Sequence, residues 1–181
     1  MTTEFLAGVG VRDITPEPEL IDNSLHSCMT VRLHERGSPM RVKALALTFG
    51  SVRSLLLAVD LVSIGGEHQK ILRQTVVDAV ELNVEDIVVS ASHSHSTPFC
   101  EPLERPHPFF DLIVRQSVAA AQTAVQAQRS ALFGHATVHV VGASFNTRVP
   151  MPDGGVKFSR DYREGLASGR PIDPRLTVVR I

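Results

Sequence analysis

The sequence predicts a layered α/β fold in which helices flank a mixed β-sheet. Two apolar runs, residues 42–49 and 54–64, are separated only by a short link, which is typical of an antiparallel hairpin. Segments of helical and of strand periodicity then alternate along the chain. The length of 181 residues, with 43% hydrophobic and 20% charged residues, is usual for one folded domain. We therefore expect a single α/β domain over residues 1–181.

The first element is an apolar, glycine-containing strand over residues 5–15, which Pro16 and Pro18 end. Residues 17–39 follow without clear periodicity and are expected to form a long loop. A loop of this length in a compact domain usually serves a function.

The two strands of the hairpin are joined around Gly50 and Ser51. Along the first strand, bulky and small side chains alternate, so one face of the sheet carries large residues and the other carries small ones. We expect the bulky face to contact the core. Its apolar members are Leu45, Leu47 and Phe49, and the small face holds Val42, Ala44, Ala46 and Thr48.

The remaining elements alternate between helix and strand. Apolar residues at helical spacing predict an amphipathic helix over residues 67–82. Residues 86–92 read as the next strand, and the alanine-rich residues 109–128 as a second helix. Strands are also expected within residues 131–145 and at 176–181. The early hairpin makes the predicted sheet mixed.

Composition excludes several classes of function. The net charge is -1 and no run of like charges occurs, so no nucleic-acid partner is expected. The first residues lack a signal-peptide pattern, and no window approaches the ~20 apolar residues of a membrane span. We expect a cytoplasmic protein without a transmembrane segment. Cys28 and Cys100 are expected to be reduced thiols.

The most informative stretch is SASHSHSTP at residues 90–98, directly after an apolar run that we expect to be an interior strand. If residues 92–96 are extended, His93 and His95 point to the same side and their imidazoles converge. Imidazole is a good ligand for Zn²⁺, although a catalytic zinc site usually takes about three protein ligands. The alternative is a polar strand end whose histidines bind neighbouring loops. The place just beyond the carboxyl end of a strand favours the metal site.

Other residues qualify for supporting roles. Asp60 interrupts an apolar strand, so it either orients a ligating imidazole or binds backbone amides at the strand end. His26, His34 and His107 lie in expected loops, and any one of them could supply a further ligand. His68, early in the first helix, is expected to be solvated.

The sequence resembles the N-terminal catalytic domain of the neutral or alkaline non-lysosomal ceramidases. The resemblance extends in order along the whole chain, and the family's version of the histidine motif reads approximately SATHTHSGP. The matching segments are AGVGVRDITP at 7–16, LLLAVDLVSI at 55–64, DIVVSASHSHSTP at 86–98, FNTRVPMPDGGV at 145–156 and DPRLTVVRI at 173–181.

The resemblance implies a function and several site residues. The family hydrolyses the N-acyl amide bond of ceramide to sphingosine and a fatty acid. His93 would be a zinc ligand, and His95 would lie beside it near the substrate in a catalytic role. Asn146 and Arg148 match an element near the active-site cleft, where Arg148 could bind a carboxylate or polar headgroup, although a surface salt bridge is an equal alternative.

In the family, the other ligands and the catalytic serine come from sequence downstream of the segment that matches 173–181. The chain is therefore expected to be the first part of a longer catalytic domain, or a short form whose site is completed otherwise or not at all. The alternative function is a non-catalytic binding or interaction module that keeps the fold. A sheet edge left uncovered would favour a homo-oligomer.

Overall fold

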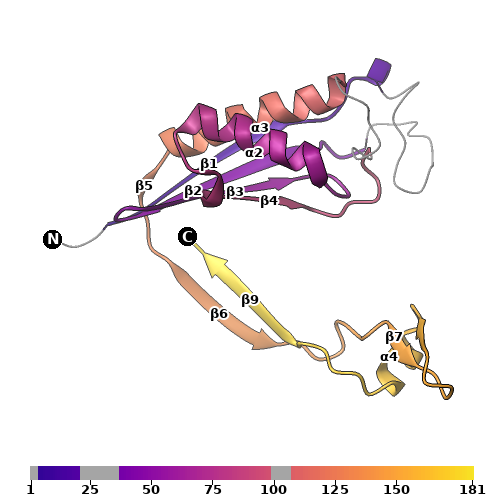
Figure 1. Ribbon diagram of the computed structural model, residues 1–181. Coiled ribbons are helices and arrows are strands. Elements are labelled where there is room, and N and C mark those ends of the chain that lie inside the picture. The colour runs from indigo at the N-terminus through magenta and orange to yellow at the C-terminus, as the bar shows by residue number, and fades with distance from the viewer. Residues whose placement is uncertain (1–3, 21–36, 99–106) are drawn as a thin grey trace. The chain divides into compact units, whose positions relative to one another are not determined.

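The computed structural model describes residues 4–20, 37–98 and 107–181, and it has the α/β fold that the sequence predicts (Figure 1). Contacts divide the chain into two compact units, Met1–Ala131 and Leu132–Ile181, which are described separately. The prediction of one domain over residues 1–181 stays a prediction.

A five-stranded mixed sheet forms the first unit, with the order β4-β3-β2-β1-β5. Neighbouring strands are antiparallel except β3 and β4, which are parallel. The predicted hairpin is confirmed as β2 and β3, whose register closes at the pair Phe49↔Val52. The strands are β1 (Phe5–Asp13), β2 (Arg41–Phe49), β3 (Val52–Val59), β4 (Ile87–Ala91) and β5 (Arg129–Ser130).

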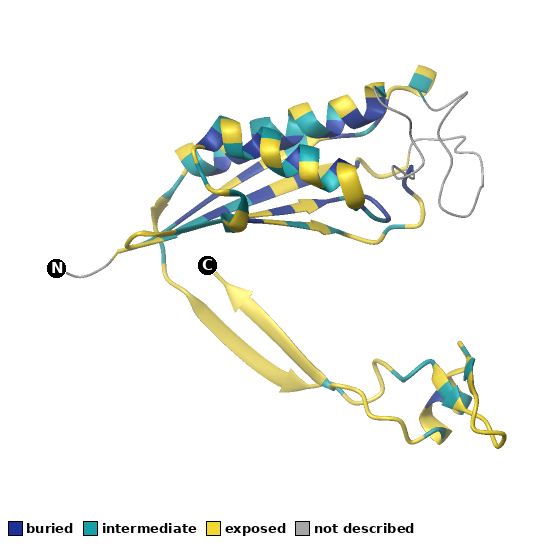
Figure 2. Cartoon of the chain, in the orientation of Figure 1, coloured by how far each residue is buried: buried dark blue, intermediate teal, exposed yellow. Residues whose placement is uncertain are grey.

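Two helices, α2 (Gly66–Val80) and α3 (Pro108–Gln126), cover one face of this sheet, and both were predicted (Figure 1). A short 3₁₀ helix, η1 (Val84–Asp86), leads from α2 into β4. The buried residues lie between the helices and the sheet (Figure 2). In the part of the chain that the structure describes, no helix has both the length and the apolar character needed to cross a bilayer.

The prediction that the bulky face of β2 contacts the core is wrong. Val42, Ala44 and Ala46 on the small face are buried, whereas Phe49 is 55% exposed. The reason is the close approach of α3 to the sheet. A Cβ atom at Gly10 of β1 would lie 2.0 Å from the backbone oxygen of Ala120 in α3. A helix held this close leaves room only for small side chains beneath it.

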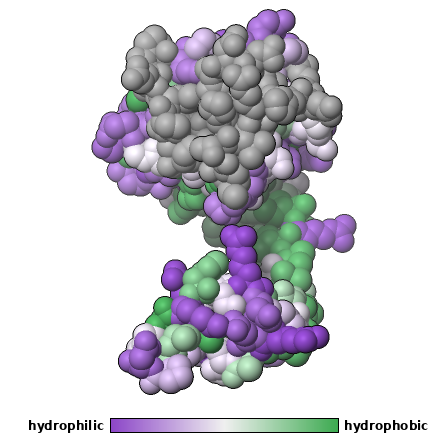
Figure 3. All heavy atoms as spheres, turned by 90° about the vertical axis from the view of Figure 1, so that its right-hand side faces the viewer, coloured by the Kyte–Doolittle hydropathy of each residue, from purple (hydrophilic) through white to green (hydrophobic). Residues whose placement is uncertain are grey.

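The second unit is built from two small antiparallel pairs. β6 (Gly134–His139) pairs with β9 (Arg175–Arg180), which confirms the two predicted strands. β7 (Arg148–Pro150), β8 (Val156–Phe158) and the helix α4 (Tyr162–Ala167) were not predicted. Every residue of β6 and β9 is exposed (Figure 2), and apolar residues lie at the surface of this unit (Figure 3).

Candidate functional site

At one end of the sheet, four strands of the first unit either start or end. The register places Asp13 opposite Arg41 and Val59 beside Ala91, so β1, β3 and β4 end where β2 begins. Hydrogen bonds continue the sheet just past these ends: the Ser92 amide donates to the Val59 carbonyl over 3.0 Å. The histidine motif therefore starts on a backbone that the sheet holds in place.

Residues 92–96 are not extended, so the predicted backbone of the motif is wrong. β4 ends at Ala91, and His93 has a φ of 59°, in the left-handed region. The buried Thr97 hydroxyl donates to the Ser94 carbonyl over 2.8 Å and closes a turn. The hydrophobic pattern could not indicate this turn, because it reports which residues are apolar and not the sign of φ.

The two imidazoles meet nonetheless, as predicted. His93 Nε2 lies 3.4 Å from His95 Nε2, with the ring centroids 4.9 Å apart and the planes at 81°. His93 Nδ1 lies 2.7 Å from the Val62 carbonyl oxygen. A carbonyl only accepts, so this bond places the His93 proton on Nδ1 and leaves the Nε2 lone pair directed at His95.

The pair fits a zinc ion in spacing and in donor type. Two zinc–imidazole bonds of about 2.0–2.1 Å at a tetrahedral angle place their nitrogens about 3.4 Å apart. A hydrogen bond from the second ring nitrogen to a carbonyl is the usual support for a ligating histidine. Both imidazoles are exposed. The described residues hold no group of three or more potential ligands, so two histidines are what this part of the chain supplies.

β4 was expected to be an interior strand, and among the described residues it is an edge strand, paired with β3 alone. The site still lies beyond the carboxyl ends of two parallel strands, which is where open α/β sheets place ligands. The parallel pair arises because α2 connects β3 to β4. This connection brings Val62, after β3, next to the motif after β4.

Asp60 contacts backbone in the structure. Its Oδ2 accepts from the Arg41 amide over 2.9 Å, and its own amide donates to the Arg41 carbonyl over 2.9 Å. These bonds match the structural alternative, an aspartate bound to backbone at a strand end. The nitrogen of His93 that Asp60 was expected to orient contacts Val62 instead.

Asn146 and Arg148 belong to the second unit. Asn146 Oδ1 accepts from the Arg148 amide over 3.0 Å, and Asn146 Nδ2 donates to the Pro171 carbonyl over 3.1 Å. The Arg148 guanidinium lies over the Phe158 ring, 5.9 Å from its centroid. Asn146 thus fixes the local backbone, while Arg148 is exposed.

The remaining histidines have separate surroundings. His107 caps α3, because its Nδ1 accepts from the Phe109 amide over 3.2 Å, and burial lowers the pKa of its imidazole, with Asp111 opposing the change. His68 is buried against Phe110, with ring centroids 4.6 Å apart, so the prediction of a solvated His68 is wrong. Among the described residues, its Nε2 has no hydrogen-bond partner. His26 and His34 lie outside the described residues.

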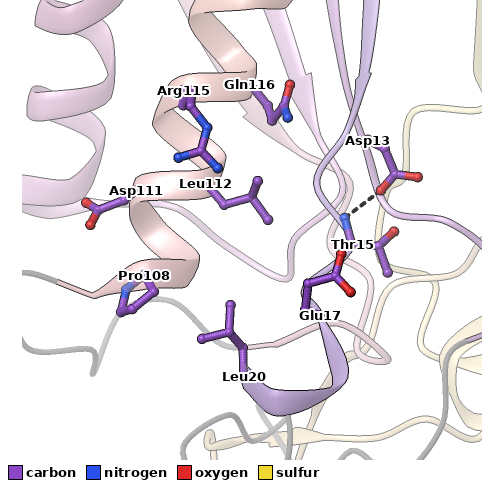
Figure 4. A pocket seen from close by; sticks show the side chains of 9 residues that line it. All are labelled: Asp13, Thr15, Glu17, Leu20, Pro108, Asp111, Leu112, Arg115 and Gln116. Carbon is purple, nitrogen blue, oxygen red and sulfur yellow. Dashed lines mark hydrogen bonds between the residues drawn. The ribbon is translucent and has the colours of Figure 1, made fainter.

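A hollow at the same end of the sheet was not predicted (Figure 4). It lies between the end of β1 and the first turns of α3, and its volume is about 560 Å³. Asp13 Oδ1 accepts from the Thr15 amide over 2.7 Å at its wall. Neither His93 nor His95 lines it. Its lining residues are Asp13, Thr15, Glu17, Leu20, Pro108, Asp111, Leu112, Arg115 and Gln116.

The fold is similar to that of solved ceramidases. A ceramidase complexed with C2 matches 98% of the chain with a TM-score of 0.66 and 20% identity, and the match spans 28% of that ceramidase. Neutral ceramidase from Pseudomonas aeruginosa matches 99% of the chain with a TM-score of 0.64 and 16% identity, over 29% of its own length. No protein-family model matches the sequence, and neither does any curated protein. The chain therefore has the fold of somewhat more than a quarter of a neutral ceramidase.

Proposed function

We propose that the protein is a zinc-dependent hydrolase of N-acyl amide bonds that acts on a ceramide-like lipid amide in the cytoplasm. The observation that carries the proposal is the pair of Nε2 atoms 3.4 Å apart, one of which belongs to a ring held by a backbone carbonyl. The likeness to solved ceramidases supports the choice of substrate.

His93 would hold the ion, and the backbone holds His93. The Val62 side chain is buried, so the carbonyl that accepts from His93 Nδ1 is fixed relative to the core. Bound zinc would polarise an amide carbonyl as a Lewis acid. His95 Nε2 lies close enough to His93 Nε2 to contact whatever binds there, and this distance supports the proposed catalytic role of His95.

Asp60 is proposed to position this centre from a distance. Its carboxylate and amide tie the end of β3 to the start of β2, and Val62 follows two residues later. For Arg148, contact with a carboxylate or a polar headgroup stays a proposal. Its guanidinium lies over an aromatic ring and is exposed, so its N–H groups are accessible to a ligand.

The test is hydrolysis of a fluorogenic N-acyl amide and of a short-chain ceramide by the metal-free chain with and without added zinc. We expect slow turnover that requires zinc, because the described residues offer His93 and one neighbouring histidine where about three protein ligands are usual. His93→Ala should abolish the turnover, and His135→Ala on the exposed strand β6 is the matched control. Turnover that is independent of zinc and of His93 would refute the proposed function.

A second candidate is a non-catalytic module that binds lipid amides. It is favoured by the two-ligand composition of the site in the described residues. The two candidates are separated by the same samples. A module would bind the short-chain ceramide equally with and without zinc, would bind it equally as His93→Ala, and would release no fatty acid.

A further inference from the structure

The outer edge of β4 is open in the part of the chain that the structure describes (Figure 1). The opposite edge of the sheet is β5, which has only two residues, whereas β4 has five and pairs with β3 alone. Proteins usually protect a longer edge with charged side chains, proline or a bulge, or they cover it. β4 reads IVVSA, without a charge or a proline, and its register with β3 is continuous. This edge is therefore suited to pair with another strand.

The backbone groups at the outer edge follow from the bonds on the other side of β4. The Ser92 amide donates to the Val59 carbonyl of β3 over 3.0 Å. Alternate residues of a strand direct their backbone N–H and C=O groups to the same side, so the residues of β4 in phase with Ser92 also bond toward β3. The N–H and C=O groups of Ile87, Val89 and Ala91 consequently point outward.

These three outward residues are arranged symmetrically about Val89. Antiparallel pairing with an identical strand would set Val89 opposite Val89 and Ile87 opposite Ala91, and each pair could exchange both of its backbone hydrogen bonds. The central pair would join two β-branched side chains, and no charge would lie opposite a like charge. The edge is thus complementary to itself both in hydrogen bonding and in side-chain pairing.

The groups at the two ends of β4 are complementary as well. Exposed Glu85 lies two residues before the strand, and exposed His93 lies two residues after it. Antiparallel pairing brings the start of one strand to the end of the other. The Glu85 carboxylate of each copy would then meet the exposed imidazoles of the other copy, and carboxylates accept strong hydrogen bonds from protonated imidazoles.

We infer that β4 is a homodimer interface, at which the β4 strands of two copies pair in antiparallel orientation about Val89 and join their sheets into one. A second copy fits this edge because the edge matches itself in hydrogen-bond phase, in side-chain pairing and in the groups at its ends. The inference does not depend on the proposed hydrolase activity. It implies that Glu85 of each copy lies near His93 and His95 of the other.

The experiment is sedimentation equilibrium of the full chain over a range of concentrations. With increasing concentration, the parent should approach twice the 19.7 kDa mass of one chain. Val89→Lys should weaken association at least about tenfold, because two lysines would then lie opposite each other at the centre of the pair. Val9→Lys, the same change at an exposed position of β1 within the sheet, should associate as the parent does.

A disulfide tests the register directly. Paired residues that exchange both hydrogen bonds have Cα atoms about 5.5 Å apart, within the range of about 4.4–6.8 Å that a disulfide spans. In a background with Cys28 and Cys100 replaced by serine, Val89→Cys should form a covalent dimer on mild oxidation. Val9→Cys in the same background is the matched control and should form much less of it.

Each outcome either supports or overturns the inference. A parent that stays a monomer at all concentrations would overturn it and leave the edge to a different polypeptide. Association that survives Val89→Lys but is lost in Val9→Lys would assign the contact to the open face of the sheet, and would also overturn it. If Val89→Lys does not fold, which circular dichroism detects, the disulfide decides: equal cross-linking through residues 89 and 9 would refute the pairing. None of these measurements requires zinc or substrate, so they fail or succeed independently of the proposed function.

Discussion

Replacement of His93 by alanine and by glycine should affect stability differently while removing the same ligand. At a φ of 59°, alanine keeps the left-handed penalty of roughly 1–2 kcal/mol, whereas glycine has no Cβ and avoids it. Glycine loses more backbone entropy on folding, which costs about 0.5–1 kcal/mol relative to alanine. Taken together, the two effects should make the free energy of unfolding of His93→Gly about 1 kcal/mol higher than that of His93→Ala.

Both variants also lose the hydrogen bond from Nδ1 to the Val62 carbonyl, which contributes about 0.5–1.5 kcal/mol in a typical case. His93→Gly should therefore be about as stable as the parent, and His93→Ala less stable by about 1 kcal/mol. With a urea slope of about 2 kcal/mol per molar, the two variants should differ by about 0.5 M in unfolding midpoint.

The assay is urea unfolding of the metal-free protein followed by far-ultraviolet circular dichroism. This signal reports mainly on α2 and α3, which both belong to the unit that carries the site. Equal midpoints for the alanine and glycine variants, or a higher midpoint for alanine, would show that residue 93 is not left-handed in solution. The explanation of how the two rings converge would then be wrong.

Four further predictions concern the support of the site. Gly10→Ala should destabilise the protein by about 3 kcal/mol or more in urea unfolding, because its Cβ would lie 2.0 Å from the Ala120 oxygen. Gly134→Ala should have little effect, because a Cβ there would have no described atom within 4 Å apart from its chain neighbours. Ser117→Ala should raise the unfolding free energy by about 1 kcal/mol, since the buried Ser117 hydroxyl has no hydrogen-bond partner in the part of the chain that the structure describes; a destabilised variant would contradict this. Because the fold lowers the pKa of His107, a falling pH protonates this imidazole in the unfolded chain before it does so in the folded chain. The free energy of unfolding is therefore higher above the ordinary pKa of 6.5 and falls as the pH drops below it. His107→Asn keeps an N-cap that does not titrate, and its urea midpoint should fall less than that of the parent over this range; an equal fall would refute the assignment. Asp60→Ala should weaken zinc binding and Asp60→Asn, which keeps an acceptor for the Arg41 amide, should not; equal affinities for both variants and the parent would leave Asp60 without a positioning role.

The order of β1 to β4 with α2 and α3, and of β6 and β9, could be predicted because each of these elements has its own apolar period. The face of β2 that contacts the core could not be predicted, because the alternation of bulky and small side chains defines two faces of the strand but not which face the helices cover. The relevant signal lay elsewhere in the chain, in Gly8 and Gly10 on β1 and in the alanines of α3, where a Cβ on either glycine would overlap the helix backbone. Close packing depends on both partners, and a strand considered alone gives only one of them.

The histidine pair shows the same limit at the site. The sequence predicts that two imidazoles one residue apart converge at a strand end, and they do converge. The means of convergence, a left-handed residue followed by a turn, cannot be read from hydrophobic periodicity. The Val62 carbonyl could not be predicted as a partner either. It reaches His93 because the register sets Val59 beside Ala91, a consequence of pairing between segments about thirty residues apart.

A site on an edge strand favours completion by groups from elsewhere. Among the described residues β4 pairs on one side only, and apolar residues on the sheet face away from the helices are exposed, with Val9 at 57% and Val88 at 53%. Unpaired edges and exposed apolar faces are usually covered in a working protein. Catalysis at zinc also takes about three protein ligands and donors for the developing oxyanion. If the protein is the zinc hydrolase proposed above, we expect that the group that covers β4 also supplies the further ligand, and that zinc affinity and turnover rise together when this group is present.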